Sequence, residues 1–379
     1  MRRLAIALTL LVLASAVTAY LFYRNFHKPL PTLVGWKAHV TTLAGDGSPR
    51  FRDANPPTQA ALSDPFGVAV AKDGTVYVAD GGESNRIRKI TPDGILTTVA
   101  GGSEGFADGA GAAASFNTPS AIALDDNGNL FVADTGNNRI RKITPEGQVS
   151  TVAGDGTAGY LDGPAAQARF NGPIGLAVGA RGEIYVADTY NDRIRTITAD
   201  GQVSTVAGAG TPGYADGDGG TALFDTPCGI AAASDGSVIV ADTGNDRLRR
   251  ITPEGSVTTV SVNQNLSGPI GLALSHDNFI YVTELDRSGI VQIAPDGSVH
   301  DIAGDESIRF NQPTGIALGP LSYRPAELYV GDSGNYLISR DDIIILLREQ
   351  VAILERSIAD KEKIIQLLET RLRRIKKAK

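Results

Sequence analysis

Residues 131–154 read FVADTGNNRIRKITPEGQVSTVAG, and this wording returns with small changes along much of the 379-residue chain. Its opening strand-like run ends in an acidic residue, and a similar ending marks each copy. These endings fall at positions 80, 134, 188, 242, 284 and 332, so the steps between copies are 54, 54, 54, 42 and 48 residues. Self-similarity at this period indicates a repeat architecture, here with six units.

Each unit contains four short β-type runs separated by turn signals. In the third unit they lie at 173–178, 184–188, 191–197 and 202–208. Turns of the TPEG type combine a proline, which fixes φ, with a glycine, which accepts a positive φ, as hairpins require. Four strands repeated six times predict an all-β fold, a six-bladed β-propeller over residues 39–340.

The ends of the repeat region indicate how the ring closes. The sixth unit has three strands and then loses the strand pattern, whereas residues 39–45, HVTTLAG, match the fourth strand QVSTVAG of a complete unit. We therefore expect the N-terminal strand to form the outer strand of the last blade. The top face is defined here as the one that holds the strand 2–3 turns and the blade-to-blade connections. Both chain ends are then expected to leave from the opposite, bottom face.

The repeated motifs resemble the NHL-repeat family, in a bacterial, membrane-anchored form. They comprise a Pro-x-Gly strand, a strand of the YVAD type and an Asn-x-Arg-Ile turn, and the resemblance covers about 39–340. Unit five departs from it because 283–293 lacks the Asn-x-Arg spacing, and in unit six Leu337 replaces the arginine. The resemblance implies a binding platform, such as the sensor domain of a membrane protein or an RNA-binding module, and in a minority of members an enzyme.

The segment 1–28 predicts a membrane anchor. Residues 4–23 carry no charge and are long enough to cross a hydrocarbon core of about 30 Å. Arg2 and Arg3 precede them, so we expect a transmembrane signal anchor with a cytoplasmic N-terminus, a linker at 29–38 and a periplasmic or cell-surface propeller. A cleaved signal peptide, giving a secreted form, is the alternative, because small residues at 14–16 fit a cleavage site.

The C-terminal segment 341–379 contains no glycine or proline and predicts a helix. Apolar residues follow a heptad spacing that includes Ile344, Leu347 and Val351, which is typical of a coiled coil. We expect a parallel two-stranded coil and hence a homo-oligomer. A trimer, or a single helix that lies on the propeller, is the alternative.

Composition and charge exclude several kinds of chemistry. One cysteine and four histidines argue against a disulfide framework, a cysteine metal cluster and an all-histidine zinc site. The termini 1–28 and 341–379 carry +4 and +3, and subtracting these from the total of −7 leaves −14 for the propeller. Such a surface repels nucleic acid. No cofactor or metal is predicted, although calcium at the Asp-Gly loops stays open.

Three blades carry the same aspartate, asparagine and arginine at the same offsets. A reaction centre is needed once, so we interpret a set copied in three blades as structural, with the arginine holding the carboxylate in a two-pronged ion pair. The set comprises Asp134, Asn137, Arg139, Asp188, Asn191, Arg193, Asp242, Asn245 and Arg247.

The long connections between blades carry an aromatic residue and an Asp-Gly pair at matching offsets. Loops of this length are usually functional or mobile, so we predict a ligand-binding surface on the top face. Its candidate residues are Phe106, Asp108, Tyr160, Asp162, Tyr214 and Asp216. The alternative is a structural role. Four further aromatic residues, each three positions before a proline, are expected to fill the gaps between blades: Phe116, Phe170, Phe224 and Phe310.

The residue after each inner-strand proline is expected at the top opening of the central channel. These residues are Phe66, Ser120, Ile174, Cys228, Ile270 and Thr314. They do not match the acidic and amide groups that gluconolactonase-like propellers use, or the histidines of amidating-lyase propellers. Because acid–base catalysis needs a poised titratable group, no catalytic residue is predicted.

These observations lead to one hypothesis and one alternative. The hypothesis is a membrane-tethered, extracytoplasmic binding module, a sensor or scaffold, that recognises a protein, glycan or small ligand and oligomerises through its C-terminal helix. The alternative is a lactonase- or lyase-type propeller enzyme with an atypical site.

Overall fold

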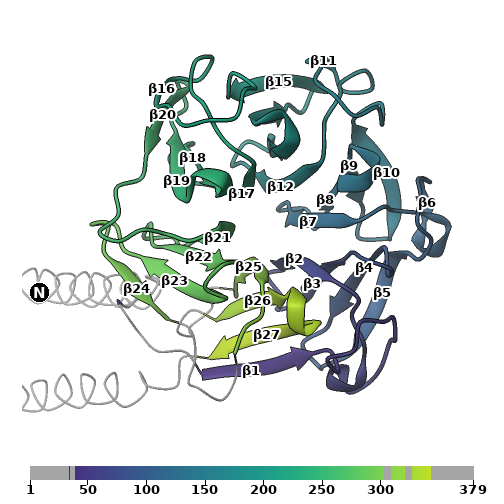
Figure 1. Cartoon of the computed structure of the whole chain (residues 1–379). Coiled ribbons are helices and arrows are strands. Elements are labelled where there is room, and N and C mark those ends of the chain that lie inside the picture. Colours follow the sequence, from purple (N-terminus) through teal and green to yellow (C-terminus); the bar gives the residue numbers. More distant parts are fainter. Residues whose placement is uncertain (1–33, 35–38, 303–308, 321–326, 343–379) are drawn as a thin grey trace, which may run out of the picture.

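The computed structural model describes residues 34, 39–302, 309–320 and 327–342. Six antiparallel sheets surround a central channel (Figure 1), which confirms the six-bladed propeller. The sheets follow one another around the ring in chain order, and within each complete blade the first strand lies innermost.

The strand bounds repeat closely from blade to blade. Blade one contains β2 (Pro65–Val70), β3 (Val76–Asp80), β4 (Arg86–Ile90) and β5 (Leu96–Gly101). Blade two contains β7 (Pro119–Leu124), β8 (Leu130–Asp134), β9 (Arg139–Ile143) and β10 (Gln148–Ala153). Blade three contains β12 (Pro173–Val178), β13 (Ile184–Asp188), β14 (Arg193–Ile197) and β15 (Gln202–Ala207).

In the second half of the ring, blades four and five have shorter outer strands. Blade four contains β17 (Pro227–Ala232), β18 (Val238–Asp242), β19 (Arg247–Ile251) and β20 (Ser256–Thr259). Blade five contains β21 (Pro269–Leu274), β22 (Ile280–Glu284), β23 (Gly289–Ile293) and β24 (Val299–Asp301). Blade six contains β25 (Pro313–Leu318), β26 (Leu328–Asp332), β27 (Leu337–Asp342) and, from the N-terminal side, β1 (His39–Ala44).

The ring closes as the sequence predicted. Strand β1 pairs with β27 in antiparallel register, from His39 opposite Asp342 to Ala44 opposite Ile338 (Figure 1). Asp341 and Asp342, which the sequence analysis assigned to the start of the C-terminal helix, are instead the last residues of β27, because β1 offers them backbone partners. The rest of the predicted helix and the whole predicted anchor lie outside the described residues.

Short 3₁₀ turns join strands two and three at the top of most blades. They are η3 (Thr135–Asn137), η4 (Thr189–Asn191), η5 (Thr243–Asn245) and η6 (Ser333–Asn335). The first residue of each donates its hydroxyl to the proline carbonyl that opens the inner strand of the next blade, as Thr135 does to Pro173 at 2.7 Å. These side chains therefore tie neighbouring blades together around the channel.

The hydrophobic core lies between the blades rather than within them. Phe116 is completely buried and packs with Ala79 and Ile87 of blade one and Val132 of blade two. Phe170, Phe224 and Phe310 are buried at the same place in later blades. The expected gap-filling role of these phenylalanines is confirmed.

Glycine allows the inner strands to approach one another closely. A Cβ added at Gly175 would overlap the carbonyl oxygen of Cys228 in the next blade, and one at Gly229 would overlap that of Ile270. At these two positions glycine is therefore a packing requirement, since a Cβ would collide with the neighbouring backbone; blade two has Ala121 at the equivalent place.

Three connections between blades add a fifth strand outside the expected four. These are β6 (Gly109–Ala110), β11 (Gly163–Pro164) and β16 (Gly217–Asp218), which pair with the outer strands β10, β15 and β20 (Figure 1). Two other 3₁₀ turns, η1 (Pro57–Gln59) and η2 (Gly111–Ala113), lie in such connections. Within the described part of the chain, no helix is long and apolar enough to span a bilayer.

Candidate functional site

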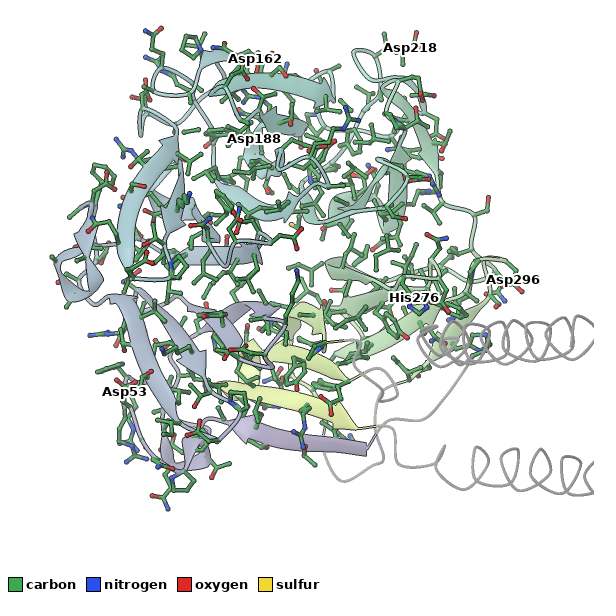
Figure 2. All side chains as sticks on the ribbon, turned by 180° about the vertical axis from the view of Figure 1, so that it is seen from behind. Asp53, Asp162, Asp188, Asp218, His276 and Asp296 are labelled. Atoms are coloured by element: carbon green, nitrogen blue, oxygen red, sulfur yellow. The ribbon has the colours of Figure 1, made fainter. Side chains whose placement is uncertain are left out.

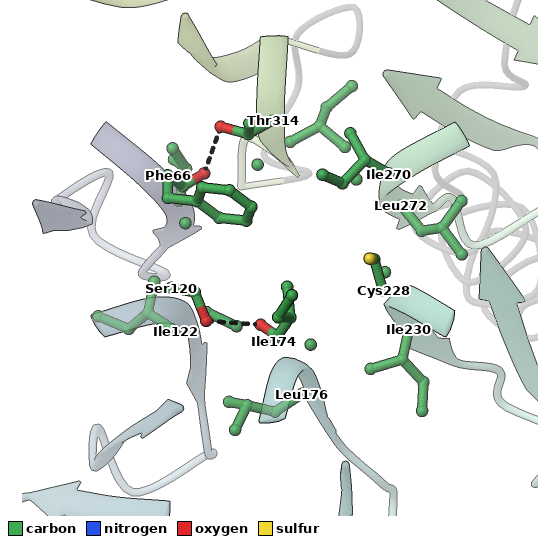
Figure 3. A pocket seen from close by; sticks show the side chains of 18 residues that line it. Phe66, Ser120, Ile122, Ile174, Leu176, Cys228, Ile230, Ile270, Leu272 and Thr314 are labelled. Carbon is green, nitrogen blue, oxygen red and sulfur yellow. Dashed lines mark hydrogen bonds between the residues drawn. The ribbon is translucent and has the colours of Figure 1, made fainter. Parts of the chain in front are cut away.

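The channel wall holds all six residues that the sequence placed at its top opening (Figure 3). They belong to a set of 18 residues, three from each inner strand, that surrounds a cavity of about 80 Å³. Apolar side chains dominate, and Figure 3 shows Ile122, Leu176, Ile230 and Leu272 around the same space. None of the 18 residues carries a carboxylate, an imidazole, an amine or a guanidinium group.

The polar side chains of this wall are already engaged. Ser120 Oγ donates a hydrogen bond to the Ile174 carbonyl at 2.9 Å, and Thr314 Oγ1 donates to the Phe66 carbonyl at 2.9 Å (Figure 3). Burial raises the pKa of the Cys228 thiol, so it stays protonated at neutral pH. The wall thus offers neither a proton acceptor nor an activated nucleophile.

The aspartate that ends strand two organises each blade. In blade two, Asp134 is fully buried and its Oδ1 accepts the backbone N–H of Asn117 at 2.8 Å. Its Oδ2 accepts hydrogen bonds from Asn137 Nδ2 at 2.8 Å and from Arg141 at 2.7 Å. The expected structural role therefore fits, but the arginine that binds the carboxylate is Arg141, two residues beyond the predicted Arg139.

Arg141 is fully buried between two aromatic rings. Its guanidinium carbon lies 4.8 Å from the Phe106 ring centroid and 5.2 Å from that of Phe116. It also forms an ion pair with Asp108 at 2.6 Å. We name this assembly the arginine clamp. It consists of a buried arginine, the strand-two aspartate and the connection aspartate that pair with it, and the aromatic ring of the connection that covers it.

The predicted Arg139 contributes to the same assembly in another way. Its guanidinium carbon lies 3.8 Å from the Phe106 ring centroid, a cation–π contact. It also donates to the Asp155 carbonyl at 2.7 Å in the following connection. Arg193 and Arg247 stack in the same manner on Tyr160 and Tyr214, at 3.9 and 4.3 Å. These arginines therefore cover the aromatic rings instead of holding the buried carboxylates.

Four blades contain the clamp. The buried arginines are Arg88, Arg141, Arg195 and Arg249; their strand-two aspartates are Asp80, Asp134, Asp188 and Asp242; their connection aspartates are Asp53, Asp108, Asp162 and Asp216. The rings above them are Phe51, Phe106, Tyr160 and Tyr214. The blade-one copy was not predicted from the sequence, although its FRD at 51–53 has the aromatic-x-Asp spacing of FAD at 106–108.

The candidate ligand-binding residues lie at the outer edge of the propeller, not on its top face. Asp162 binds Thr205 on outer strand β15, through the backbone N–H at 3.1 Å and the hydroxyl at 2.9 Å. Figure 2 shows Asp53 and Asp162 at the perimeter and Asp188 further in. The placement differs because each connection folds down along the next blade and pairs with its outer strand.

The clamp holds its outer carboxylates in the charged form. Burial opposes ionisation of Asp162 and Asp216, but Arg195 and Arg249, together with Thr205 and Thr259, outweigh it and lower both pKa values. Tyr160 Oη donates to Asp162 at 3.0 Å. Tyr214 Oη instead lies 2.9 Å from Thr259 Oγ1, which donates to Asp216. The aspartates and tyrosines that suggested a recognition surface therefore belong to the clamps, while the two rings remain 45 to 47% exposed.

Metal-binding groups do not gather anywhere in the described part of the chain. No group of three or more histidine, cysteine, aspartate or glutamate side chains there has a metal-binding arrangement. Among the Asp-Gly loops considered for calcium, Asp108, Asp162 and Asp216 each direct an oxygen to a buried arginine.

Comparison with known proteins identifies the repeat. A family model described as the teneurin NHL domain matches residues 45–108 and 101–198. The chain belongs to the NHL-repeat β-propeller family. Teneurin-4 of Homo sapiens is 31% identical over 257 residues, which cover 58% of this chain and 9% of that protein. NHL repeat-containing protein 2 of Bos taurus is 31% identical over 186 residues, which cover 45% of this chain and 26% of that protein. The chain thus spans only a small part of these relatives.

Solved propeller structures share the fold of this NHL propeller at low identity. A gluconolactonase from Xanthomonas campestris aligns with a TM-score of 0.57 and 14% identity, covering 81% of this chain and 90% of that chain. A streptogramin B lyase aligns with a TM-score of 0.53 and 16% identity, covering 82% and 100%. At this identity the likeness shows the architecture alone.

Proposed function

We propose that this NHL propeller is an interaction module, a sensor or scaffold, for a protein or glycan partner. Residues 1–28 tether it to a membrane with the propeller outside the cytoplasm, and residues 341–379 join copies of the chain in a coiled coil. In this role the repeated charged residues stabilise the fold, and the exposed surface binds the partner.

The chemistry of the channel wall carries this proposal. Enzyme sites and small-molecule sites usually occupy about 300–1,000 Å³ and contain titratable groups within reach of the substrate. The channel cavity measures about 80 Å³, and its only titratable side chain is the Cys228 thiol. The arginines and aspartates that could serve elsewhere are held in the clamps, so binding is favoured over catalysis.

The exposed aromatic rings of the clamps support a contact surface at the perimeter. Phe51, Phe106, Tyr160 and Tyr214 are 43 to 47% exposed at equivalent positions of four successive blades. Aromatic residues are enriched at protein interfaces, where they supply large contact areas. The chain enters the described region at His39 and leaves at Asp342, which pair with each other, so an anchor and a coil attached there leave this perimeter accessible.

A binding experiment with matched variants tests the surface. The wild-type full chain is first used to capture a partner by cross-linking at the cell surface, and the purified partner must rebind. A full-chain variant with Phe106, Tyr160 and Tyr214 all changed to alanine should not bind that partner. Tyr190→Ala removes an even more exposed tyrosine, 60% accessible in the top turn η4, and should keep the partner. Equal capture by both variants would contradict the proposed surface.

Two further measurements test the tether and the assembly. Protease should degrade the propeller in intact cells if it lies on the cell surface, or after removal of the outer membrane if it is periplasmic. The protein should sediment with membranes through 1–28. Sedimentation equilibrium should give a higher mass for the soluble chain than for the same chain without 343–379. A monomer in both cases would remove the coiled coil from the proposal.

One alternative is an enzyme with an atypical site, because gluconolactonase and lyase propellers share this fold. Turnover of a panel of lactones, lost on chelation and restored by a divalent metal, would favour that alternative. We expect no turnover above a heat-denatured control, because the described channel wall supplies no acid, base or metal ligand.

A further inference from the structure

The bottom end of the channel opens into a larger space than the one enclosed by the inner strands. A cavity of about 650 Å³ opens among the strand 1–2 turns of blades two to five; we name it the bottom cavity. A slot of about 140 Å³ between blades three and four shares five lining residues with it, so the two spaces are contiguous. This volume falls in the range of small-molecule sites. Its described lining comes from blades two to five, whereas the clamps belong to blades one to four.

Local sequence differences create this space. The last inner-strand residue is valine or leucine in five blades, but it is Ala232 in blade four, so the slot opens where two side-chain carbons or more are missing. The facing turn of blade three runs from Gly179 to Glu183 and presents Ala180 to both spaces. The Glu183 side chain folds back over Gly179.

The floor of the bottom cavity is apolar and its rim is polar. Leu124, Val178 and Leu274 end their inner strands at the floor. Tyr185 lines the slot and donates to Glu183 at 3.3 Å. Burial, with the nearby Glu183 carboxylate, raises the pKa of Tyr185, so its hydroxyl stays neutral. The floor therefore offers aliphatic and aromatic surface to the apolar part of a ligand.

Carboxylates dominate the charged groups of the rim. The two spaces are lined by Asp125, Asp126, Glu183 and Asp235, against one guanidinium, Arg181, and the imidazole of His276. Figure 2 shows His276 on blade five, closer to the ring centre than Asp296. Burial opposes ionisation of Asp125, but hydrogen bonds from Asn129 and Asn127 lower its pKa, so it is charged at neutral pH.

The cations that neighbour this rim are held weakly. Lys72 contacts Asp126 at 2.8 Å, but their side chains are 84% and 90% exposed. Arg250 pairs with Asp235, and these side chains are 44% and 56% exposed. Ion pairs in water contribute little, so an incoming cation competes with them readily. The acidic propeller also raises the local concentration of cations.

We propose that the bottom cavity and its slot bind a small organic cation with an apolar body, such as an arylalkyl amine. The apolar part lies on Leu124, Val178 and Leu274, and the ammonium group lies at the rim beside Asp126 and Glu183. The site goes beyond the partner surface proposed above, which lies at the perimeter, so either can fail alone.

Three probes with the same body test the chemistry. Isothermal titration calorimetry with the full chain should show that 4-phenylbutylamine binds, that 4-phenylbutanol binds at least about fivefold more weakly, and that 4-phenylbutyrate binds more weakly still. Equal affinity for all three would overturn the charge preference. The absence of heat from the amine up to its solubility limit would overturn the site.

Matched substitutions test the place. Ala180→Trp fills the opening shared by cavity and slot and should weaken amine binding at least about tenfold. Ala112→Trp adds the same side chain to another exposed alanine, in turn η2 of the outer connection, and should leave binding unchanged. Asp126→Asn should weaken binding a few-fold and reduce its dependence on salt. Undiminished binding by a folded Ala180→Trp variant, judged by circular dichroism, would contradict the location.

Discussion

Blades one to four and blades five and six have the same strands but different chemistry inside them. All six blades keep an acidic residue at the end of strand two that accepts a backbone N–H; Glu284 does so from Ser267 and Asp332 from Asn311, each at 2.8 Å. Only the first four add the arginine clamp. Where Arg141 stands in blade two, blade five has Val291 and blade six has Ser339.

The difference follows the connections. Before blade two, residues 102–118 turn down along the outer edge and carry Phe106 and Asp108, whereas before blade five only 260–268 intervene. With no connection aspartate to meet, blade five pairs Glu284 with Arg287 from the turn, at a longer 3.4 Å. Every blade therefore has a strand-two carboxylate that accepts a backbone N–H. The clamp is an addition that binds a long connection to this carboxylate through the buried arginine.

Loss of a clamp arginine should have the largest effect. Arg141→Ala removes the guanidinium that pairs with the buried Asp134, which should cost about 3–5 kcal/mol of the free energy of unfolding in urea. The matched change in blade six, Ser339→Ala, should cost less than about 1 kcal/mol, because that side chain pairs with no carboxylate. Similar losses from the two variants would erase the distinction between the blade types.

A smaller core residue at the interblade position should have the next largest effect. Phe116 is fully buried, and blades one and five carry Leu62 and Leu266 at the same place. Phe116→Leu should lower the unfolding free energy by about 1–2 kcal/mol, because the leucine leaves part of the space empty and no longer lies against Arg141. Leu266→Ala serves as the comparison in a blade without a clamp and should show the ordinary loss of a buried leucine.

Acid should weaken the clamps specifically. The pKa of Asp216 is lowered in the folded protein, so its stabilising contribution is present above the unfolded value of about 3.9 and is lost as the pH falls below it. The difference in melting temperature between wild type and Asp216→Asn should therefore shrink between pH 5 and pH 3. A constant difference over this range would show that the carboxylate charge does not contribute.

Removal of the half-exposed ring should have the smallest effect. Phe106→Leu keeps an apolar cover over Arg139 and Arg141 but loses the cation–π contacts, which should cost about 0.5–1 kcal/mol in chemical denaturation. Blade five has no equivalent ring to lose. A cost above that of Phe116→Leu would mean that the outer ring, not the interblade ring, supports the arginine.

The sequence alone predicted the framework because the repeats align every blade with its neighbours. Ring closure followed from the match of 39–45 to a fourth strand, and burial of Phe116 followed from its fixed distance to the next proline. The clamp partner was harder to predict. Arg139 and Arg141 share one face of β9, and the backbone pairing of Asp134 with Arg139 does not determine which long side chain reaches the carboxylate. The pairing of the glycine-rich connections with the outer strands could likewise not be predicted from any short motif.

The candidate sites divide in the same way. The six channel residues could be located because their position relative to the proline is constant. The bottom cavity was not predicted, because no motif marks it. It depends on the small side chain of Ala232, where the other blades have valine or leucine, and on the volume left between the turns. Alignment of the six inner strands by their last residue would have provided that signal.

Ring closure by β1 and β27 also determines how the propeller responds to mechanical load. The chain enters at His39 and leaves at Asp342, and these two residues face each other at one end of the antiparallel pair. Tension between His39 and Asp342 therefore acts along the hydrogen bonds between β1 and β27. These bonds break one after another from this end of the pair, instead of being sheared all at once. A pull between a bilayer and an assembled tail would peel away the outer strand of blade six at low force while the other five blades keep their pairing.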